Sequence, residues 1–466
     1  GRRIPIALPN TGALARRRHT LYIRSAIILF ILFAFLQFHV INYAFTDSSD
    51  TPQSEGNYST AAILQMVPPV FHKYLTSKSR NNTNNGQYNG THALNDLYRT
   101  PNISEMMRMI NRYNEMQSVY NEDLFGPLQN DSVIIVVQVH KRITYLRHLI
   151  VSLAQAKDIS RTLIVFSHDF YDDDINDLVQ SIDFCKVIQI FYPYSIQTHP
   201  YEFPGADPGD CPRDIKKEQA LLRKCNNALY PDLYGHYREA KFTQTKHHWW
   251  WKANRVFDQL EITRYHTGMV VFLEEDHYVA EDFLYVLELM HRKSIDLCPK
   301  CNILSLGTYL KTFNYYTYSK NVEVTPWISS KHNMGMVFNR STWAEIIRCA
   351  QHFCGYDDYN WDWSLQHVSQ QCLKQKLHVM VVKGPRVFHI GECGVHHKKS
   401  NCESNQVISK VQQVLRVAQK SRQLYPKTLS LTFASVIKKT KLRKGNGGWG
   451  DKRDHILCLN MTLSAR

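Results

Sequence analysis

Apolar runs separated by amphipathic segments characterise the chain beyond residue 105. The runs lie at residues 132–139, 162–166, 187–192, 269–273 and 378–382. Runs of this length with little polar alternation are typical of strands that are covered on both faces of a sheet. Residues 145–156, with leucines at positions 146, 149 and 153, and residues 106–117 have the spacing of helices. Alternating strands and helices predict an α/β, Rossmann-like domain whose central sheet is mostly parallel and flanked by helices.

A much longer apolar segment lies near the N-terminus, at residues 25–45. It is long enough to span the roughly 30 Å hydrocarbon core of a bilayer. Arginines precede it at positions 2, 3, 16, 17, 18 and 24. The positive-inside rule therefore predicts a cytoplasmic tail at residues 1–24, a transmembrane anchor at residues 25–45 and a lumenal remainder. A cleaved signal peptide is the alternative, although the segment exceeds a usual h-region and no Ala-x-Ala site follows it.

The composition after the anchor favours a lumenal protein. Residues 46–104 are rich in Ser, Thr, Asn and Gly and lack sustained periodicity, which predicts a flexible stem before a domain at residues 105–466. All eleven cysteines lie beyond the anchor, as expected in an oxidising compartment. Sequons for N-glycosylation occur at Asn57, Asn81, Asn89, Asn102, Asn130, Asn339 and Asn460.

The odd number of cysteines leaves at least one outside intramolecular disulfides. Cys185 lies in an apolar stretch and is the candidate for the free thiol. The Cys298–Cys301 motif favours a short disulfide loop over half of a zinc site or a redox centre. Sequence alone does not fix the remaining connectivity. Local pairs that it allows are Cys211 with Cys225 and Cys393 with Cys402.

Two functional classes are disfavoured. The formal net charge of +15 is partly concentrated in the arginines before residue 25, and the rest is dispersed among acids, which argues against a nucleic-acid platform. No Gly-x-Gly-x-x-Gly follows the first strand, which argues against a conventional NAD-binding domain. With 44% hydrophobic residues over 466 positions, the chain can bury the core that an enzyme needs.

Three adjacent carboxylates, Glu274, Glu275 and Asp276, end the apolar run that begins at Met269. A buried strand of an α/β sheet delivers its last residues to the rim where ligands bind. Hard oxygen ligands at this rim suit Mg²⁺ or Mn²⁺, and such an ion suits a substrate that carries phosphates. The alternative is that the acids only cap the following helix.

Polar side chains follow the other predicted strands as well. Gln138, His140 and Arg142 stand at the end of the first strand, and Asp169 follows the second. Because the carboxyl ends of parallel strands meet at one edge of a sheet, we expect these side chains beside the three carboxylates. His389 follows the run at residues 378–382 and could bring an imidazole to the same metal, although a lone histidine is more often structural.

Two aromatic clusters suggest a sugar or nucleotide ligand. Neighbours on a helix are about 100° apart, so at least one ring of Trp249–Trp251 should be available to a cleft or an adjoining loop. The preceding His247 and His248 could bind zinc, but adjacent histidines diverge on a helix. Residues 356–363 contain three acids and four aromatics, a combination suited to a saccharide acceptor, with surface decoration as the alternative.

Several motifs occur in the same order as in a known family. They are Gln138–Arg142, Phe166–Asp169, Glu239–Trp251, Phe272–His277, His332–Gly335, Tyr356–Trp363 and Asn446–Asp451. From about residue 105 to residue 455 the chain resembles the N-acetylglucosaminyltransferase II family of the Golgi. The resemblance implies a GT-A fold, Mn²⁺ as cofactor and UDP-GlcNAc as donor. It also implies inverting transfer, in β1,2 linkage, to the α1,6-linked mannose of an N-glycan that already carries GlcNAc on its other arm.

The resemblance assigns roles position by position. Asp276 and His389 match the metal ligands, and Asp362 matches the general base. Glu274–Asp276 corresponds to the family's DxD-type motif without its usual first Asp, and Lys141 replaces an asparagine, which should alter a backbone-dominated contact rather than abolish it. The expected donor-binding residues are Gln138, Val139, His140, Lys141, Arg142, Asp169, Gln244, Thr245, Lys246, His247 and His248.

Other functions stay open at this point. One is a related N-acetylglucosaminyltransferase that acts on another mannose arm. Another is a catalytically silent Golgi lectin, against which the retention of Asp276 and Asp362 argues. The expected location is the Golgi membrane, as a single-pass type II protein with a lumenal catalytic domain and no nucleic-acid partner. A homodimer is compatible with the sequence, which does not determine the oligomeric state.

Overall fold

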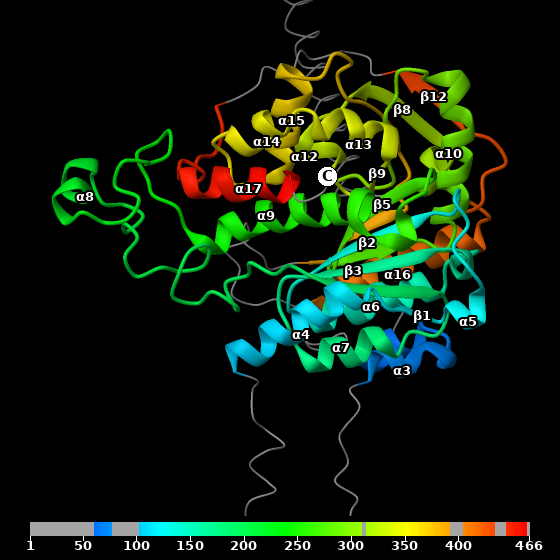
Figure 1. Ribbon diagram of the computed structural model, residues 1–466. Coiled ribbons are helices and arrows are strands. Elements are labelled where there is room, and N and C mark those ends of the chain that lie inside the picture. The colour runs from blue at the N-terminus through cyan, green and yellow to red at the C-terminus, as the bar shows by residue number, and fades with distance from the viewer. Residues whose placement is uncertain (1–59, 77–101, 310–313, 392–403, 434–443, 464–466) are drawn as a thin grey trace, which may run out of the picture. The chain divides into compact units, whose positions relative to one another are not determined.

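The structure is a computed structural model that describes residues 60–76, 102–309, 314–391, 404–433 and 444–463. All of them belong to one compact unit, Tyr58–Arg466. Its centre is a ten-stranded sheet with the order β1-β4-β3-β2-β5-β9-β7-β10-β8-β12 (Figure 1). The predicted anchor at residues 25–45 lies outside the described residues. Within the described part of the chain, no helix combines the length and apolar character needed to cross a membrane.

The parallel half of the sheet consists of strands that the apolar runs predict. They are β2 (Ile134–Val139), β3 (Leu163–His168), β4 (Lys186–Phe191) and β5 (Met269–Glu274). β2 lies between β3 and β5, and β4 continues beyond β3, all in parallel. Gln138 is in register with both Ser167 and Glu274, so the carboxyl ends of three strands reach the same edge. The predicted convergence of their polar residues is therefore confirmed at the level of the backbone.

The other half of the sheet is mixed. Its strands are β7 (Ile303–Ser305), β8 (Asn321–Pro326), β9 (Met336–Asn339), β10 (His378–Val382) and β12 (Ser430–Phe433), while β1 (Val119–Tyr120) borders β4. β9 runs antiparallel to β5 and β7. Five of the nine neighbouring pairs in the described sheet are parallel, so the predicted mostly parallel sheet is confirmed by a narrow margin. A separate pair, β6 (His277–Val279) with β11 (Val387–His389), is antiparallel.

Helices cover both faces of the sheet (Figure 1). One face packs on α6 (Ile143–Ala154), α7 (Asp173–Gln180) and α10 (Phe283–Leu297). The other packs on α9 (Ala240–Asn254), α13 (Arg340–Ile347), α14 (Ala350–Gly355), α15 (Trp361–Gln371) and α17 (Lys452–Leu463). Ile135 and Val137 face the first core, whereas Ile134 and Val136 face the second. Burial on both faces explains why β2 shows no polar alternation in the sequence.

Further helices and turns lie around these layers. Outside the sheet layers lie α4 (Ile103–Met116), α5 (Glu122–Phe125), α8 (Lys217–Arg223), α11 (Tyr315–Tyr318), α12 (Ser329–His332) and α16 (Ser404–Lys420). Single turns lie at Ile159–Arg161 and Glu261–Thr263, and a π-helical turn at Arg255–Gln259 extends α9.

The three consecutive tryptophans are all buried on α9. Trp249 stacks on Trp361 with ring centroids 4.5 Å apart, and Trp250 stacks on Phe353 at 4.2 Å. Trp251 packs against Tyr192 beside the loop after β4. The expected contact of one ring with an adjoining loop is therefore confirmed by Trp251, whereas no ring of the three is exposed to a cleft. The reason is that α9 is enclosed between the sheet and the α14, α15 and α17 layer and so buries several of its sides.

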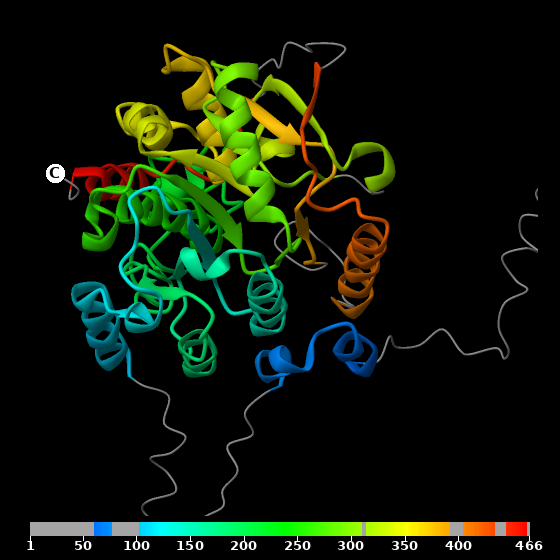
Figure 2. The same ribbon diagram turned by 90° about the vertical axis from the view of Figure 1, so that its right-hand side faces the viewer.

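Part of the predicted stem is folded. Residues 60–76 contain α2 (Thr60–Gln65), a turn at Pro69–Phe71 and α3 (His72–Leu75). Tyr74 is fully buried, its hydroxyl donates to Asp183 at 2.6 Å, and Arg147 donates to its carbonyl at 2.9 Å. Figure 2 shows these helices in blue beside α16 in orange, where Ile63 shares a core cluster with α16. A few well-spaced apolar side chains are enough to anchor such short helices. They hardly change the polar composition of residues 46–104, so composition alone indicated a flexible stem.

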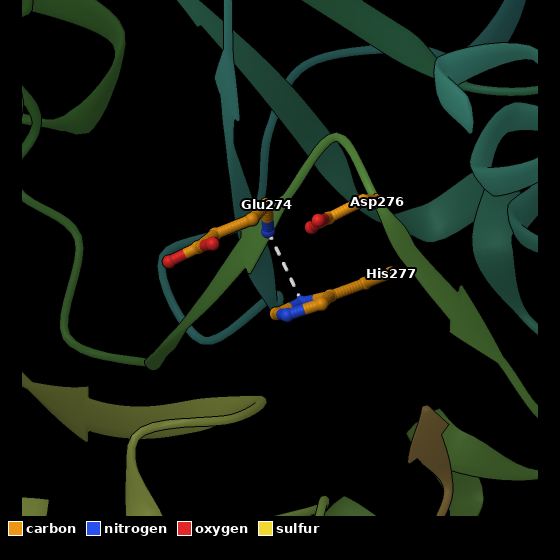
Figure 3. Close-up of side chains that lie close together, drawn as sticks. All are labelled: Glu274, Asp276 and His277. Carbon is orange, nitrogen blue, oxygen red and sulfur yellow. Dashed lines mark hydrogen bonds between the residues drawn. The ribbon is translucent and has the colours of Figure 1, made fainter. Parts of the chain in front are cut away.

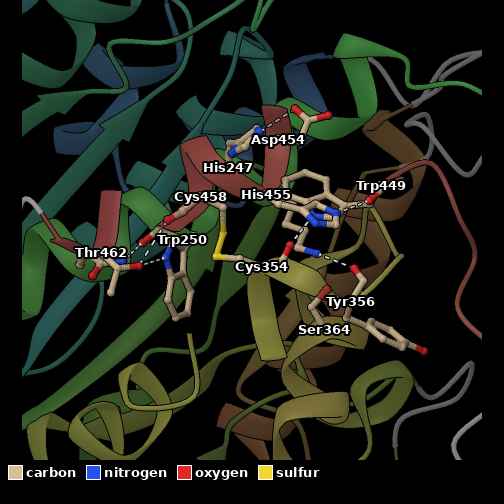
Figure 4. The surroundings of a disulfide bond; sticks show 12 residues. His247, Trp250, Cys354, Tyr356, Ser364, Trp449, Asp454, His455, Cys458 and Thr462 are labelled. Carbon is tan, nitrogen blue, oxygen red and sulfur yellow. Dashed lines mark hydrogen bonds and ion pairs between the residues drawn. A yellow bond between two sulfur atoms is a disulfide. The ribbon is translucent and has the colours of Figure 1, made fainter. Parts of the chain in front are cut away.

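Four disulfides lie within the described residues. They are Cys211–Cys225, Cys298–Cys301, Cys349–Cys372 and Cys354–Cys458. The first two and the free, buried Cys185 confirm the sequence predictions. Cys393 and Cys402 lie outside the described residues. Cys354–Cys458 joins α14 to α17 (Figure 4), where Trp449 also donates to the Cys354 carbonyl at 2.8 Å.

We expect removal of Cys354–Cys458 by Cys354→Ala with Cys458→Ala to lower the free energy of unfolding by about 3–5 kcal/mol. The bond spans 104 residues, so its loss releases a large loop in the unfolded chain. Guanidinium unfolding of a fragment that begins after residue 45 would measure the change. The matched double alanine variant of Cys298–Cys301, which spans 3 residues, should lose markedly less, and equal losses would contradict the loop-length explanation.

Candidate active site

The predicted metal ligands Asp276 and His389 lie side by side. Asp276 is in the turn between β5 and β6, and His389 ends β11, where it is in register with His277 of β6. His389 Nε2 is 3.1 Å from Asp276 Oδ2. Asp276 Oδ1 is buried and has no hydrogen-bond partner among the described residues. A Cβ at Gly391 would lie 2.2 Å from Asp276 Oδ2, so only glycine leaves room for this carboxylate.

Glu274 and His277 complete a group that could hold a metal ion. With Asp276 they offer one carboxylate or imidazole atom each, all within 4.8 Å of one another (Figure 3). His277 Nδ1 accepts a hydrogen bond from the Glu274 N–H at 3.1 Å, and burial lowers the pKa of His277 to about 3. A neutral imidazole beside carboxylate oxygens fits a divalent cation. Sequence analysis missed His277, although it directly follows the acidic triplet.

Glu275, the middle acid of the triplet, makes its contacts with protein groups rather than with the Asp276–His389 pair. It accepts from Arg142 Nε at 2.7 Å and from the His140 N–H at 2.8 Å. Arg142 also reaches Asp276 Oδ2 at 2.9 Å. Burial alone would raise the pKa of Asp276, but the hydrogen bond and charge of His389 and the charge of Arg142 hold it well below its usual range. Arg142 thus ties the end of β2 to the acidic turn.

Asp169 is the centre of a second polar cluster at the same edge. It accepts from His140 Nδ1 at 2.6 Å and from Gln244 Nε2 at 3.1 Å, and His248 Nδ1 lies 3.3 Å from it. Burial alone would raise the pKa of Asp169, but hydrogen bonds and charge from His140 and His248 hold it well below its usual range. The structure therefore brings together four residues expected at the donor: His140 just after β2, Asp169 just after β3, and Gln244 and His248 on α9.

The other expected donor residues lie in different surroundings. Gln138 accepts a hydrogen bond from the buried Lys252, and Lys141 is exposed, with its ammonium 5.6 Å from the Phe170 ring centroid. Val139 is buried in the core, and Thr245 is half-buried on α9. The binding role of these four residues stays a prediction.

Lys246 and His247 are buried against the C-terminal part of the chain. Lys246 Nζ donates to the carbonyls of Tyr356 and Asp358, each at 3.0 Å. Burial lowers the pKa of Lys246 to about 7. His247 Nε2 lies 2.9 Å from Asp454 Oδ1. Through these contacts both residues hold α9 against the C-terminal part of the chain. They do not meet Asp169 as Gln244 and His248 do, because side chains at neighbouring positions of a helix point to different sides.

The candidate base Asp362 stands in the first turn of α15. Its Oδ1 accepts from the Trp363 N–H and its Oδ2 from Asn333 Nδ2, each at 3.0 Å. Burial, together with the negative charges of Asp358 and Glu274, raises the pKa of Asp362 to about 7. Burial and the charges of Glu274, Asp362 and Asp276 raise the pKa of Tyr309. Tyr309 therefore interacts electrostatically with the candidate base and with the acidic residues of the candidate metal site. Sequence analysis did not identify Tyr309, and it named Asn333 only as part of the His332–Gly335 motif.

The pKa of Asp362 predicts a pH dependence. A carboxyl whose pKa is raised to about 7 is protonated below that pH and cannot accept a proton. We therefore expect kcat/KM to fall about tenfold per pH unit below pH 7 and to level off above it. Rates at subsaturating substrate from about pH 5 to about pH 9 would measure it. An acidic limb near pH 4, the ordinary range of aspartate, would contradict this.

The aromatic and acidic cluster at residues 356–363 divides between packing and surface. Asp357 accepts from the N–H groups of Leu233 and Trp449, and Trp361 is in the core. Tyr359 instead packs against Phe242 at 5.1 Å and lines a cavity of about 420 Å³. Other residues of this cavity include Arg213, Asp232, His236, Glu239 and Asn446. Of the residues 356–363 that were predicted to bind a saccharide acceptor, Tyr359 is the one that lines this cavity.

Comparisons with known proteins agree with the geometry. A family model described as N-acetylglucosaminyltransferase II (MGAT2) matches residues 107–458. The alpha-1,6-mannosyl-glycoprotein 2-beta-N-acetylglucosaminyltransferase of Rattus norvegicus is 45% identical over 75% of this chain and 78% of its own length. The protein of that name from Homo sapiens is 44% identical over 75% and 78%, and that from Arabidopsis thaliana 33% over 74% and 78%.

Solved structures are more distant. Staphylococcus aureus TarS (residues 1–349) aligns over 72% of this chain and 80% of its own with a TM-score of 0.30 and 11% identity. The glycosyltransferase GlyE of Streptococcus pneumoniae aligns over 65% and 66% with a TM-score of 0.30 and 9% identity. Overlap at this level is too low to support a shared mechanism.

Proposed function

The chain belongs to the N-acetylglucosaminyltransferase II family, and from this premise we propose that it transfers GlcNAc from UDP-GlcNAc to the α1,6-linked mannose of an N-glycan core. The new linkage is β1,2, and the configuration at C1 is inverted. The observation that carries the proposal is the arrangement of three groups. The Asp276–His389 pair and the polar cluster around Asp169 lie at one sheet edge, and Asp362 on α15 is near enough to Glu274 of the same edge for that charge to raise its pKa. Family membership also leads us to assign the mixed sheet to the GT-A class.

Asp276 and His389 would hold Mn²⁺, with Glu274 and His277 close by. The buried Asp276 Oδ1, which lacks a partner among the described residues, supports this assignment because a buried carboxylate oxygen is costly to leave unpaired. When bound, the ion neutralises the charge that grows on the diphosphate as it leaves. Carboxylate and imidazole together suit Mn²⁺ better than a purely oxygen-ligated ion such as Ca²⁺.

Asp362 would take the proton from the 2-hydroxyl of the acceptor mannose. That oxygen then forms its bond to C1 of the donor sugar as the bond from C1 to the diphosphate breaks on the opposite face, which inverts the configuration. General base catalysis of this kind contributes about 10²- to 10⁴-fold in rate. The raised pKa of Asp362 matches the task, because a carboxylate near pKa 7 is a stronger base than an ordinary one.

The donor would lie along the end of β2. Asp169, His140 and Gln244 form a preorganised polar cluster that suits the hydroxyls of a ribose and the edge of a uracil ring. The exposed ammonium of Lys141 would stand at the rim of this site. The cavity around Tyr359 would receive a part of the acceptor glycan, since aromatic faces beside carboxylates and amides are suited to sugar rings.

We place the protein in the Golgi membrane, anchored by the apolar segment at residues 25–45 with the catalytic domain in the lumen. The disulfides support an oxidising compartment. The runner-up function is a related transferase that acts on another mannose arm, and no contact among the described residues favours it.

The test uses the soluble lumenal part, defined N-glycans and UDP-GlcNAc with Mn²⁺. We expect UDP release only with glycans that present the α1,6-linked mannose and GlcNAc on the other arm, and a product with a new β1,2 linkage. Product linkage would be determined by mass spectrometry and NMR. Transfer to another arm would establish the runner-up, and glycan binding without UDP release would point to a lectin.

A further inference from the structure

The folded part of the stem, residues 60–76, is fixed to the domain at its C-terminal end by Tyr74. The hydroxyl of this fully buried side chain donates to Asp183 at 2.6 Å. Arg147 of α6 donates to the carbonyls of Tyr74 and Thr76 at 2.9 and 3.1 Å. Helices of six and four residues are too short to be stable alone in water, so this stem segment owes its shape to its contacts with the domain.

The other end of the stem segment lies behind the strands that carry the candidate metal ligands. Ile63 of α2 is buried and shares a core cluster with Tyr278 of β6 and Phe388 of β11. These two rings are in register with each other, and the next pair along the β6–β11 ladder is His277 with His389. Because successive side chains of a strand point to opposite faces, one face of the ladder bears both imidazoles and the other bears both rings. Ile63 therefore belongs to the apolar cluster on the face away from the imidazoles.

The stem segment also closes one side of a cavity behind β6. Met66, Pro68 and Phe71 line this cavity of about 490 Å³, together with Tyr278 and residues of α6 and α16. Tyr278 is buried in the present arrangement. Release of the stem segment would open the cavity to water and remove apolar neighbours from the back of β6.

We propose that the stem segment positions the metal site, with Ile63 as the residue that holds the β6–β11 ladder from behind. Two short antiparallel strands are marginally stable by themselves and need a covered apolar face to keep one geometry. The family model begins at residue 107, so the stem segment precedes the part of the chain that it matches. The inference rests on the proposed metal-dependent transfer and adds to it a support for the metal site that the family comparison does not assign.

The expected defect concerns the metal more than the base. Ligands must be held within about 0.5 Å of their productive geometry, and the ladder carries His277 and His389. Asp362 belongs to α15, which packs on the other face of the central sheet. A loosened ladder should therefore weaken binding of the ion, and with it of UDP, but leave transfer by the loaded enzyme close to normal. A general loss of packing would instead lower turnover at every Mn²⁺ concentration.

The experiment uses the full chain in detergent and compares Ile63→Asp, Ile63→Leu and the control Val70→Asp, which places the same charge at an exposed position of the same segment. For Ile63→Asp we expect the Mn²⁺ concentration that gives half-maximal UDP binding in calorimetry to rise about tenfold. Turnover at saturating Mn²⁺ should stay near that of the wild type. Ile63→Leu conserves the side-chain volume and should, like Val70→Asp, require as little Mn²⁺ as the wild type.

Hydrogen exchange gives a readout that does not depend on Mn²⁺. Amides of β6 and β11 should exchange faster in Ile63→Asp than in Val70→Asp, whereas those of β3 should not change. Tyr74→Phe removes only the hydroxyl that bonds Asp183 at the other end of the segment. It should show the same changes to a lesser degree, and it serves as the test if Ile63→Asp does not fold.

Three results would overturn the inference. They are an equal Mn²⁺ requirement in Ile63→Asp and Val70→Asp, unchanged exchange of β6 and β11, and a loss of turnover that saturating Mn²⁺ does not restore. Failure of the proposed function looks different. If Asp276→Ala keeps the Mn²⁺-dependent UDP affinity of the wild type, the metal site itself is wrong, whatever the stem variants show.

Discussion

Replacing Asp362 by asparagine is expected to reduce turnover by about 10²- to 10⁴-fold while Mn²⁺-dependent UDP binding persists. The substitution keeps the shape of the side chain but removes its capacity to accept a proton. The site at Asp276 and His389 belongs to β5, β6 and β11 rather than to α15, so donor binding does not depend on Asp362. Steady-state transfer rates and calorimetric UDP titration would measure the two effects separately.

The control for this variant is Gln371→Ala, at the exposed end of α15, which should leave both quantities unchanged. Wild-type turnover in Asp362→Asn would remove the residue from the role of base. Simultaneous loss of turnover and UDP binding would indicate that α15 has a larger structural influence on the donor site than its contacts suggest.

The sheet edge was predictable because strand periodicity and polarity carry its position directly. The apolar runs at residues 132–139, 162–166 and 269–273 correspond to β2, β3 and β5, and parallel pairing forces their last residues to one edge. The distance of 3.1 Å between His389 and Asp276 followed less directly. This distance depends on the antiparallel pairing of β6 with β11, which no local sequence pattern predicts. The family resemblance supplied only the role of His389 as the second metal ligand.

Other parts of the site depend on long-range packing and were beyond sequence reasoning. Glu275 and Asp276 are adjacent in the chain, yet Glu275 is satisfied by Arg142 and His140 while Asp276 meets His389. Both acids lie in the two-residue turn between β5 and β6, where the chain changes direction, so one of them can bind the protein while its neighbour serves a ligand. Choosing between them requires the position of Arg142.

The same reason explains the segment at residues 244–248. Gln244 and His248, four residues apart, lie on one side of α9 and meet Asp169. Lys246 and His247 lie on other sides and hold the chain near Asp358 and Asp454. Helical periodicity predicts that the five residues cannot all face one ligand, but only the packing of α17 and α15 on α9 tells which of them are structural.

Replacing Asp276 by alanine is expected to lower Mn²⁺-dependent UDP affinity by at least about 10- to 100-fold, the range for groups that support a metal ligand, since this residue would hold the ion itself. Its carboxylate is the group that joins His389 to the acidic turn, and the pKa of Asp276, held well below its usual range, keeps it charged at every pH at which the enzyme would work. Calorimetric titration of UDP with and without Mn²⁺ would measure the effect.

Two comparisons make this result specific to the metal. Asp276→Asn keeps the side-chain shape and the space beside Gly391, so a similar loss in that variant would exclude a simple packing defect. Asp174→Ala removes an exposed acid on α7 and should bind UDP as wild type does. If Asp276 acts through the ion, the variant with Mn²⁺ and the wild type with a chelator should have the same weak UDP affinity. Unchanged affinity in Asp276→Ala would show that the diphosphate is held by other residues, with Arg142 as the first to be tested.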